Sequence, residues 1–356
     1  MTDIAEIDRN FAVKTNIQRE GLRFYSAQTP PFRVSGIFME NGRYRRIPEE
    51  VARTVSPGVL FLHANTAGGR VRFVTDSPYV AIHAEMDGVA RMSHFALTGV
   101  AGFDLYDGTR YVKTFTPPLD VESGFEGVVD LGTGMKQITI NFPLYSNVRE
   151  LSVGLREGCF LGAPEPYVNA EPIVYYGSSI TQGGCASRPG MAYQAIVSRR
   201  LNCDYVNLGF SGSAKAEDAI AEYIAGLPMS VFVYDYDHNA PNAEYLASTH
   251  EKMFRTIRRS HPDLPVIMMS RPHHVLTADV LARRAVVEKT YRDALADGDK
   301  NVYFLDGTAL TALCGGDGNV DGVHPTDFGF VSMAEAVCGV LEQIDGFAPT
   351  DHAVHI

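Results

Sequence analysis

The second half of this chain alternates short apolar runs with longer helical patterns, and this alternation constrains the fold more than any other feature. Runs typical of strands lie at 173–176, 204–208, 230–236, 265–270 and 302–305. Patterns typical of helices lie near 191–201, 215–226, 242–259, 277–296 and 327–344. Such alternation forms βαβ units, whose strands are parallel and whose helices cover both faces of the sheet. We therefore predict a three-layer α/β/α domain in this half.

Residues 32 to 155 follow a different rhythm, in which short apolar runs are separated by turn residues. The runs lie at 59–62, 71–74, 79–82, 111–115 and 137–140, and only residues 48–53 have a helical pattern. Many short strands at close spacing predict an all-β sandwich, similar to a jelly roll. The segment 161–166, Leu-Gly-Ala-Pro-Glu-Pro, suits a linker. We therefore predict two domains, residues 1–165 and 166–356.

The composition excludes several classes of protein. The chain has 356 residues with 31 basic and 42 acidic side chains, a net charge of −11. That charge disfavours nucleic acid or an anionic membrane as a partner, since both need a basic footprint. The chain start lacks the pattern of a secretory signal, and no apolar run is long enough to span a membrane. Five cysteines without a C-x-x-C pair indicate neither a disulfide framework nor a zinc site. We expect a cytoplasmic protein.

Polar residues directly after the predicted strands are the candidates for chemistry, because ligands of open parallel sheets bind beyond the carboxyl ends of the strands. Ser179 follows the first strand on a glycine turn, Gly212 follows the second, and Asn239 follows the third. Asp321 and His324 stand three residues apart before the last helix, where the histidine could act as a general base oriented by the aspartate. Each block alone is common in loops and helix caps.

Together the four blocks resemble the SGNH, or GDSL, esterase and lipase superfamily, over about residues 172–345. The family's Gly-Asp-Ser-Leu block corresponds to 177–180, its Gly-x-Asn-Asp block to 236–239, and its Asp-x-x-His-Pro block to 321–325. Two positions depart from the family pattern: Ser178 stands where Asp is usual, and Ala240 follows Asn239 where Asp is usual. In the first half, residues 101–106 resemble the G-x-D-L-Y signature of a β domain that precedes some SGNH hydrolases.

The resemblance implies a flavodoxin-like hydrolase domain and assigns roles to the residues of the four blocks. Ser179 would be the nucleophile, His324 would shuttle its proton, and Asp321 would fix the imidazole tautomer. The Ser179 N–H, the Gly212 N–H and the Asn239 side chain would form an oxyanion hole. This chemistry is physically consistent, because serine needs an adjacent base and the tetrahedral intermediate needs preorganised donors. No metal or organic cofactor is required.

The substrate is less constrained than the reaction. Arg271 and His273 follow the fourth strand and His238 follows the third, so these three are candidates for substrate binding. Asp235, Asp237 and the neighbouring histidines fit no standard metal-ligand spacing.

By analogy with similar architectures, we expect a serine esterase that acts on a small O-acyl group, with acetyl favoured, on a carbohydrate. A lactonase or thioesterase would use the same residues, and an inactive carbohydrate-binding protein is the alternative from another class. The partner would then be a small-molecule or oligosaccharide ester; the oligomeric state stays open, a homo-oligomer included.

Overall fold

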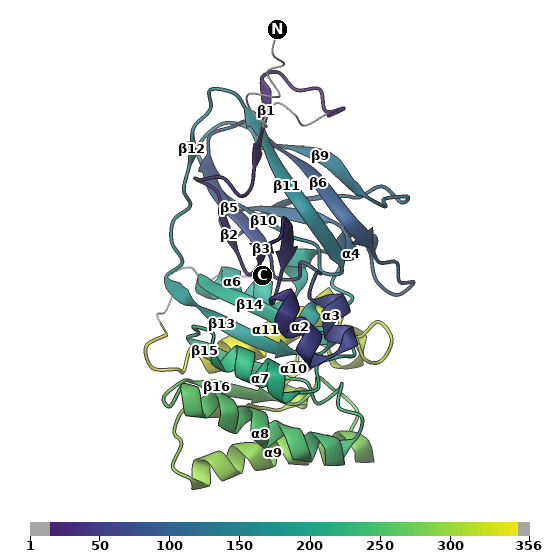
Figure 1. Cartoon of the computed structure of the whole chain (residues 1–356), viewed down its shortest axis with the longest axis vertical. Helices are drawn as coiled ribbons and strands as arrows, with labels where there is room; N and C mark the ends of the chain where they lie inside the picture. The colour runs from purple at the N-terminus through teal and green to yellow at the C-terminus, as the bar shows by residue number, and fades with distance from the viewer. Residues whose placement is uncertain (1–14, 348–356) are drawn as a thin grey trace. The chain divides into compact units, whose positions relative to one another are not determined.

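The computed structural model describes residues 15–347, and the chain forms two compact units (Figure 1). Among the described residues, the first comprises 15–45, 64–166 and 188–190. The second comprises 46–63, 167–187 and 191–347. This division differs from a single boundary after residue 165, because the early segment 46–63 belongs to the second unit and the short segment 188–190 to the first.

The first unit is built from two antiparallel sheets. One has the order β1 (Leu22–Ser26), β11 (Ser146–Arg156), β6 (Tyr79–Val89) and β9 (Gly124–Asp130). The other has the order β12 (Leu161–Gly162), β5 (Arg70–Thr75), β10 (Lys136–Asn141), β7 (Phe103–Asp107) and β8 (Arg110–Phe115), with β2 (Arg33–Ser35) paired to β5. A hairpin of β3 (Phe38–Glu40) and β4 (Arg43–Arg45) and the short helix α4 (Leu97–Val100) complete it. Both sheets contribute alternate apolar residues to one core, including Ile82, Phe73 and Val153. The predicted β-sandwich is confirmed.

The apolar run at 59–62, which was predicted as a strand, is helical. It forms α3 (Pro57–Leu62), directly after α2 (Glu49–Val55). The side chain of Ser56 accepts a hydrogen bond from the Val59 N–H at 3.2 Å, and Pro57 occupies the first helical turn. A Ser-Pro start of this kind favours a helix, and here it outweighs the short apolar run. The predicted linker also begins later than expected, since residues 161–162 pair with β5 as β12.

The second unit contains a five-stranded parallel sheet. Its order is β14 (Cys203–Gly209), β13 (Asn169–Gly177), β15 (Val231–Asp235), β16 (Val266–Met269) and β17 (Val302–Leu305). Numbered along the chain, this is the 2-1-3-4-5 order of flavodoxin-like folds. All five strands lie where the sequence predicted them, and so the carboxyl ends of β13, β14 and β15 meet at one edge of the sheet.

Helices cover both faces of this sheet (Figure 1). On one face, α7 (Asp218–Ala225), α8 (Ala243–Ser260) and α9 (Ala278–Ala296) bury side chains such as Ile224 and Phe254 against Tyr176. On the other face, α6 (Tyr193–Leu201) packs beside α11 (Asp327–Leu341), and the ring of Tyr193 contacts that of Tyr175 with centroids 5.5 Å apart. The predicted three-layer α/β/α arrangement is confirmed. Within residues 15–347, no helix combines the length and apolar character needed to cross a membrane.

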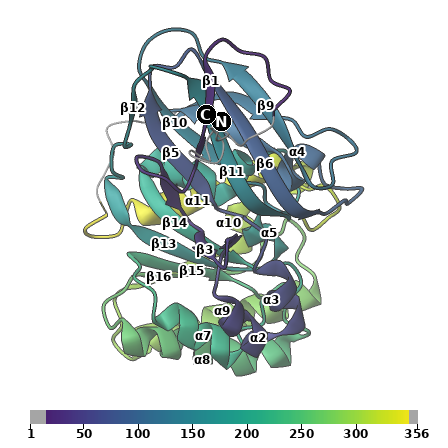
Figure 2. The ribbon, with the colours of Figure 1, turned by 45° about the horizontal axis from the view of Figure 1, so that its top comes forward.

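The helices α2 and α3 extend the first of these faces. Ile47, Ala52, Val59 and Leu62 are buried in the same core as α7 and α8, and Figure 2 shows α2 and α3 beside these helices. The remaining short helices of the unit lie in loops: α5 (Ser179–Gln182), α10 (Gly307–Leu310) and η3 (Gly315–Gly318), while η2 spans Pro189–Met191. The second unit therefore depends on a segment that precedes most of the sandwich in sequence.

Candidate active site

Ser179 lies at a tight strand-to-helix turn, where β13 ends at Gly177 and α5 begins. The Ser178 hydroxyl caps this helix by accepting a hydrogen bond from the Ile180 N–H at 3.2 Å. The end of β14 approaches α5 closely, since a Cβ on Gly209 would lie 2.1 Å from the Gln182 nitrogen. Only glycine fits there. Ser179 itself is only 5% exposed, so neighbouring residues restrict the position of its side chain.

Ser179, His324 and Asp321 form a continuous chain of hydrogen bonds. The Ser179 Oγ lies 2.9 Å from the His324 Nε2, and the His324 Nδ1 lies 2.8 Å from the Asp321 Oδ2. Because an ionised carboxylate can only accept, the neutral imidazole carries its proton on Nδ1 and presents the Nε2 lone pair to the serine hydroxyl. This geometry allows the histidine to take the serine proton.

The loop before α11 fixes the carboxylate of Asp321. Its Oδ1 accepts hydrogen bonds from the backbone N–H groups of Val323 at 3.0 Å and His324 at 2.8 Å. Desolvation by burial opposes ionisation, but these two N–H groups and the His324 imidazole outweigh it and lower the pKa of Asp321 to about 2. Asp321 is therefore ionised at any ordinary pH and stabilises a positive charge on the imidazole.

The candidate oxyanion donor Asn239 is hydrogen-bonded to the turn that contains Gly212, the other candidate. The Asn239 Nδ2 donates to the Phe210 oxygen at 3.0 Å, which orients the side-chain amide and leaves its second N–H for another acceptor. Gly212 follows in the same turn with a φ of +67°, a conformation that favours glycine. Gly212 and Asn239 thus follow β14 and β15, the two strands that flank β13, whose carboxyl end leads to Ser179.

Arg46 supports this edge, and sequence analysis did not predict it. The residue is 2% exposed, and its guanidinium donates to the backbone oxygens of Asn207, Gly209 and Leu62 and stacks on the Phe210 ring at 4.6 Å. It therefore fixes the end of β14 just before the Gly212 turn. No sequence signal indicated this role, because Arg46 stands in the half that was assigned to the sandwich.

The three predicted substrate-binding residues gather in one pocket of about 320 Å³. Arg271, His238 and His273 line it together with Ile180 and Val323, the neighbours of Ser179 and His324 in sequence. The Arg271 backbone N–H is anchored on the buried carboxylate of Asp237 at 3.1 Å. The pocket therefore lies beside the serine and histidine.

His238 is a fixed donor in this pocket. Its Nδ1 accepts a hydrogen bond from the Arg271 Nη1 at 2.8 Å, so its ring proton resides on Nε2. Burial is the largest cause that lowers the pKa of His238, to about 4, and the positive charges of Arg271 and of His324 when it is protonated act in the same direction. His238 thus stays neutral when His324 becomes charged, and it does not compete as a base.

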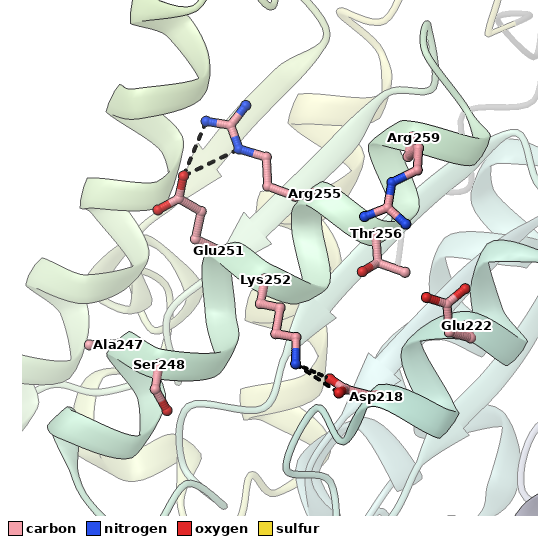
Figure 3. A pocket seen from close by; sticks show the side chains of 9 residues that line it. All are labelled: Asp218, Glu222, Ala247, Ser248, Glu251, Lys252, Arg255, Thr256 and Arg259. Atoms are coloured by element: carbon pink, nitrogen blue, oxygen red, sulfur yellow. Dashed lines mark hydrogen bonds and ion pairs between the residues drawn. The ribbon is translucent and has the colours of Figure 1, made fainter.

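A second groove of the same unit lies over α7 and α8 and is of a different kind. Its side chains neutralise one another: Lys252 pairs with Asp218 at 2.6 Å and Arg255 with Glu251 at 3.1 Å (Figure 3). Asp235, Asp237 and the histidines of the pocket do not gather as a cluster of metal-ligand atoms in the described part of the chain. Neither feature competes with the Ser179 edge as a reaction centre.

In the first unit, the G-x-D-L-Y signature has a structural explanation. Asp104, its aspartate, is fully buried and accepts hydrogen bonds from Asn141 Nδ2 at 2.7 Å, Arg188 Nη1 at 2.8 Å and the Gly190 N–H at 2.8 Å. The Arg188 guanidinium also lies over the Tyr111 ring, 3.9 Å from its centroid. The signature therefore holds the segment 188–190, which follows Ser179 by nine residues in sequence.

Comparisons with known proteins agree with this geometry. Residues 170–342 match the GDSL-like lipase/acylhydrolase family, and residues 22–160 match the N-terminus of SGNH-hydrolase-type esterases that is named GxDLY. A search of curated proteins found no similar sequence. The chain belongs to the SGNH/GDSL esterase and lipase superfamily, and it is an SGNH-type esterase with an N-terminal GxDLY domain.

Several solved structures are similar to this chain over most of its length. A GDSL-like lipase of Bacteroides ovatus ATCC 8483 is 28% identical, with a TM-score of 0.81 over 90% of this chain and 97% of that chain. The salicylyl-acyltransferase SsfX3 from a tetracycline biosynthetic pathway is 22% identical, with a TM-score of 0.77 over 93% and 100%. A family two carbohydrate esterase of Clostridium thermocellum, solved with cellohexaose, is 16% identical, with a TM-score of 0.58 over 80% and 94%. The last two likenesses concern the fold.

Proposed function

We propose that this protein hydrolyses a small O-acyl ester, with acetyl favoured, on a carbohydrate, through an acyl-serine intermediate. The observation that carries the proposal is the hydrogen-bond chain from Ser179 through His324 to Asp321. The carbohydrate part rests on analogy with the fold of the family two carbohydrate esterase. A cytoplasmic location remains a prediction, supported by five cysteines that form no disulfide within residues 15–347.

In the first half-reaction, His324 Nε2 takes the hydroxyl proton of Ser179 while Oγ attacks the ester carbonyl carbon. The carbonyl oxygen becomes an oxyanion, which accepts hydrogen bonds from the Ser179 and Gly212 N–H groups and from the Asn239 amide. Asp321 stabilises the imidazolium that forms. When the intermediate collapses, the C–O bond to the sugar breaks, and the leaving oxygen takes the proton from His324.

In the second half-reaction, a water molecule attacks the acyl-serine. His324 takes a proton from the water and then returns it to the Ser179 Oγ, so that the carboxylic acid leaves and the enzyme is restored. The pocket of Arg271, His238 and His273 would hold the part of the substrate that extends past Ile180. Its fixed donors suit a substrate rich in acceptor oxygens, such as a sugar.

A panel of esters tests this function. Purified protein is assayed with p-nitrophenyl acetate, butyrate and octanoate, then with acetylated sugars, lactones and thioesters, with Ser179→Ala as the control. We expect the acetyl ester to be favoured over octanoyl and acetylated sugars to release acetate. A preference for lactones or thioesters would change the proposed substrate class but not the roles of Ser179, His324 and Asp321. A rate in Ser179→Ala equal to that of the wild type would reject the proposed reaction itself.

Acyl transfer to an acceptor other than water is a second candidate, favoured by the similarity of the fold to a salicylyl-acyltransferase. An acyl-serine intermediate can react with any nucleophile that reaches it, and so the two activities differ only in the second half-reaction. Adding alcohols and sugars as acceptors to the ester assay separates them. New ester product formed at the expense of free acid would favour the transferase.

A further inference from the structure

A buried carboxyl group lies directly beneath the turn that carries Ser179. Asp235 is the last residue of β15, it is 3% exposed, and it lies level with Gly177 on the neighbouring strand β13. A Cβ on Gly177 would lie 1.7 Å from the Asp235 Oδ1, so this carboxyl fills the space that the glycine leaves free. The hydrolytic scheme above assigns no role to Asp235.

This carboxyl accepts hydrogen bonds from groups on both sides of the Ser179 residue, namely Ser178 and Thr181. The Thr181 Oγ1 donates a hydrogen bond to the Asp235 Oδ1, and the backbone N–H of Ser178 also donates to this carboxyl. The Thr181 carbonyl is held in turn by the side-chain amides of Gln194 at 2.7 Å and Asn207 at 2.8 Å. The position of the Ser179 hydroxyl and N–H therefore depends on Asp235 through two short links.

The surroundings of Asp235 disfavour its ionised form. In the described part of the chain, the groups that act on it are Thr181, the Ser178 amide, Asp237 and the Tyr193 phenol, and no cation is among them. Its second oxygen is buried and has no hydrogen-bond partner within residues 15–347. Burial is the main cause that raises the pKa of Asp235, to about 8, and the charge of Asp237 adds to it, against the hydrogen bonds from Thr181 and Ser178.

We propose that Asp235 is a positioning residue of the hydrolytic reaction, which holds the Ser179 turn as a neutral carboxylic acid. The inference rests on the proposed function, since it assumes that Ser179 is the nucleophile. A neutral acid accepts the hydrogen bonds of Thr181 and Ser178 without adding a negative charge below the site where the oxyanion forms. That combination supports both the geometry and the electrostatics of the attack.

Two substitutions separate a neutral acid from a carboxylate. Asp235→Asn keeps the accepting oxygen and the shape of the neutral acid but cannot ionise, and so we expect kcat close to that of the wild type at pH 7. Asp235→Ala removes the acceptor, and we expect kcat to fall on the order of 10²-fold with KM nearly unchanged, because the turn of the nucleophile shifts. Thr181→Val should lower kcat in the same direction, and combining it with Asp235→Ala should add little.

Stability against pH gives a readout that does not depend on activity. In the wild type the unfolded chain loses the Asp235 proton near pH 4, whereas the folded protein keeps it to about pH 8. Folding therefore becomes less favourable as the pH rises from about 4 to about 8. Asp235→Asn should remove this part of the decline, so its Tm should exceed that of the wild type more at pH 8 than at pH 5.

Thr290→Val is the matched control. Thr290 is buried on α9, where it is hydrogen-bonded to His250 Nδ1 at 2.9 Å, and it belongs to no part of the site. This variant should lower Tm by a similar amount at both pH values and leave kcat unchanged. It thus reports what the loss of an ordinary buried hydrogen bond does to the same unit.

Three outcomes would overturn the proposal. Wild-type kcat in Asp235→Ala would remove the positioning role. Loss of activity in Asp235→Asn as severe as in Asp235→Ala would mean that a carboxylate is needed. A Tm difference between wild type and Asp235→Asn that is equal at pH 5 and pH 8 would mean that Asp235 is ionised in the folded protein; this outcome stands even if Asp235→Ala does not fold. Failure of the proposed function is seen separately, as full activity in Ser179→Ala.

Discussion

Two regions of the second unit each place an aspartate near Ser179 or His324, and the pKa values of the two carboxyl groups are shifted in opposite directions. In the loop before α11, the side chain of Asp321 is 36% exposed, accepts hydrogen bonds from two backbone N–H groups and an imidazole, and has its pKa lowered to about 2. At the buried end of β15, Asp235 meets burial and a second carboxyl, and its pKa is raised to about 8. The difference arises from the surroundings alone, since the side chains are identical.

The contrast follows the charges that develop during the reaction. A positive charge forms on His324, on the side of Asp321, and there a permanent carboxylate is stabilising. A negative charge forms at the oxyanion, beside the Ser179 turn, and there a neutral acid supports the backbone without repelling it. Environments that push the pKa values of two titratable groups apart are typical of acid–base sites.

The largest loss of kcat is expected from substitutions of Ser179 and His324, the nucleophile and the base. Ser179→Ala and His324→Ala should each lower kcat by about 10⁴-fold or more, because nucleophile and base act as a unit. Circular dichroism and Tm should show that both variants are folded. Combining the two should cost little beyond either one, as steady-state kinetics of the double variant would reveal.

Replacing aspartate by asparagine should lower kcat strongly at position 321 and leave it nearly unchanged at position 235. Asp321→Asn should lower kcat by about 10⁴-fold, because an amide no longer fixes the Nδ1–H tautomer of His324. Asp235→Asn should leave kcat close to the wild-type value. Steady-state kinetics of the pair at pH 7 measure this directly; equal losses in the two variants would remove the distinction on which the comparison rests.

On the oxyanion side, Asn239→Ala should lower kcat by about 10²–10³-fold while KM changes little, since the amide is aimed at a charge that exists only in the transition state. His238→Ala, one residue away, is the control and should have a much smaller effect on kcat. A raised KM with unchanged kcat in Asn239→Ala would instead make Asn239 a substrate-binding residue.

The smallest expected effects concern stability against pH, where the two carboxyls should differ in sign. Asp321 contributes stability above its unfolded pKa, near 4, and loses it as the pH falls toward about 2. Asp235 makes folding less favourable as the pH rises from about 4 to about 8. Urea unfolding between pH 3 and pH 9 should therefore show a shallower acid limb in Asp321→Asn and a shallower neutral limb in Asp235→Asn. Curves that differ from the wild type only by a constant offset would contradict both assignments.

The sequence predicted the parts of the site that follow from strand order. Ser179, Gly212 and Asn239 each follow a strand of one parallel sheet, so their convergence at one edge required only the order of the elements. Asp321 and His324 were predicted as a pair because three residues of loop suffice to join them. The roles themselves remain predictions until the variants are measured.

Residues that act from a distance in sequence could not be predicted in this way. Arg46 reaches the end of β14 from a segment that lies about 160 residues earlier, and the apolar pattern of 59–62 gave no sign that it would be a helix in the core of the second unit. The raised pKa of Asp235 depends on burial and on the absence of a cation among the described groups that act on it, and a local sequence pattern indicates neither. Long-range packing, rather than local pattern, determines these features.

The most direct test of the central claim is covalent labelling with a fluorophosphonate probe, followed by peptide mapping of the modified residue. We expect one label per chain on Ser179, no label in Ser179→Ala, and much slower labelling in His324→Ala because the hydroxyl is no longer activated. Folded wild-type protein that takes up no probe, or that is modified at a residue other than Ser179, would contradict the account.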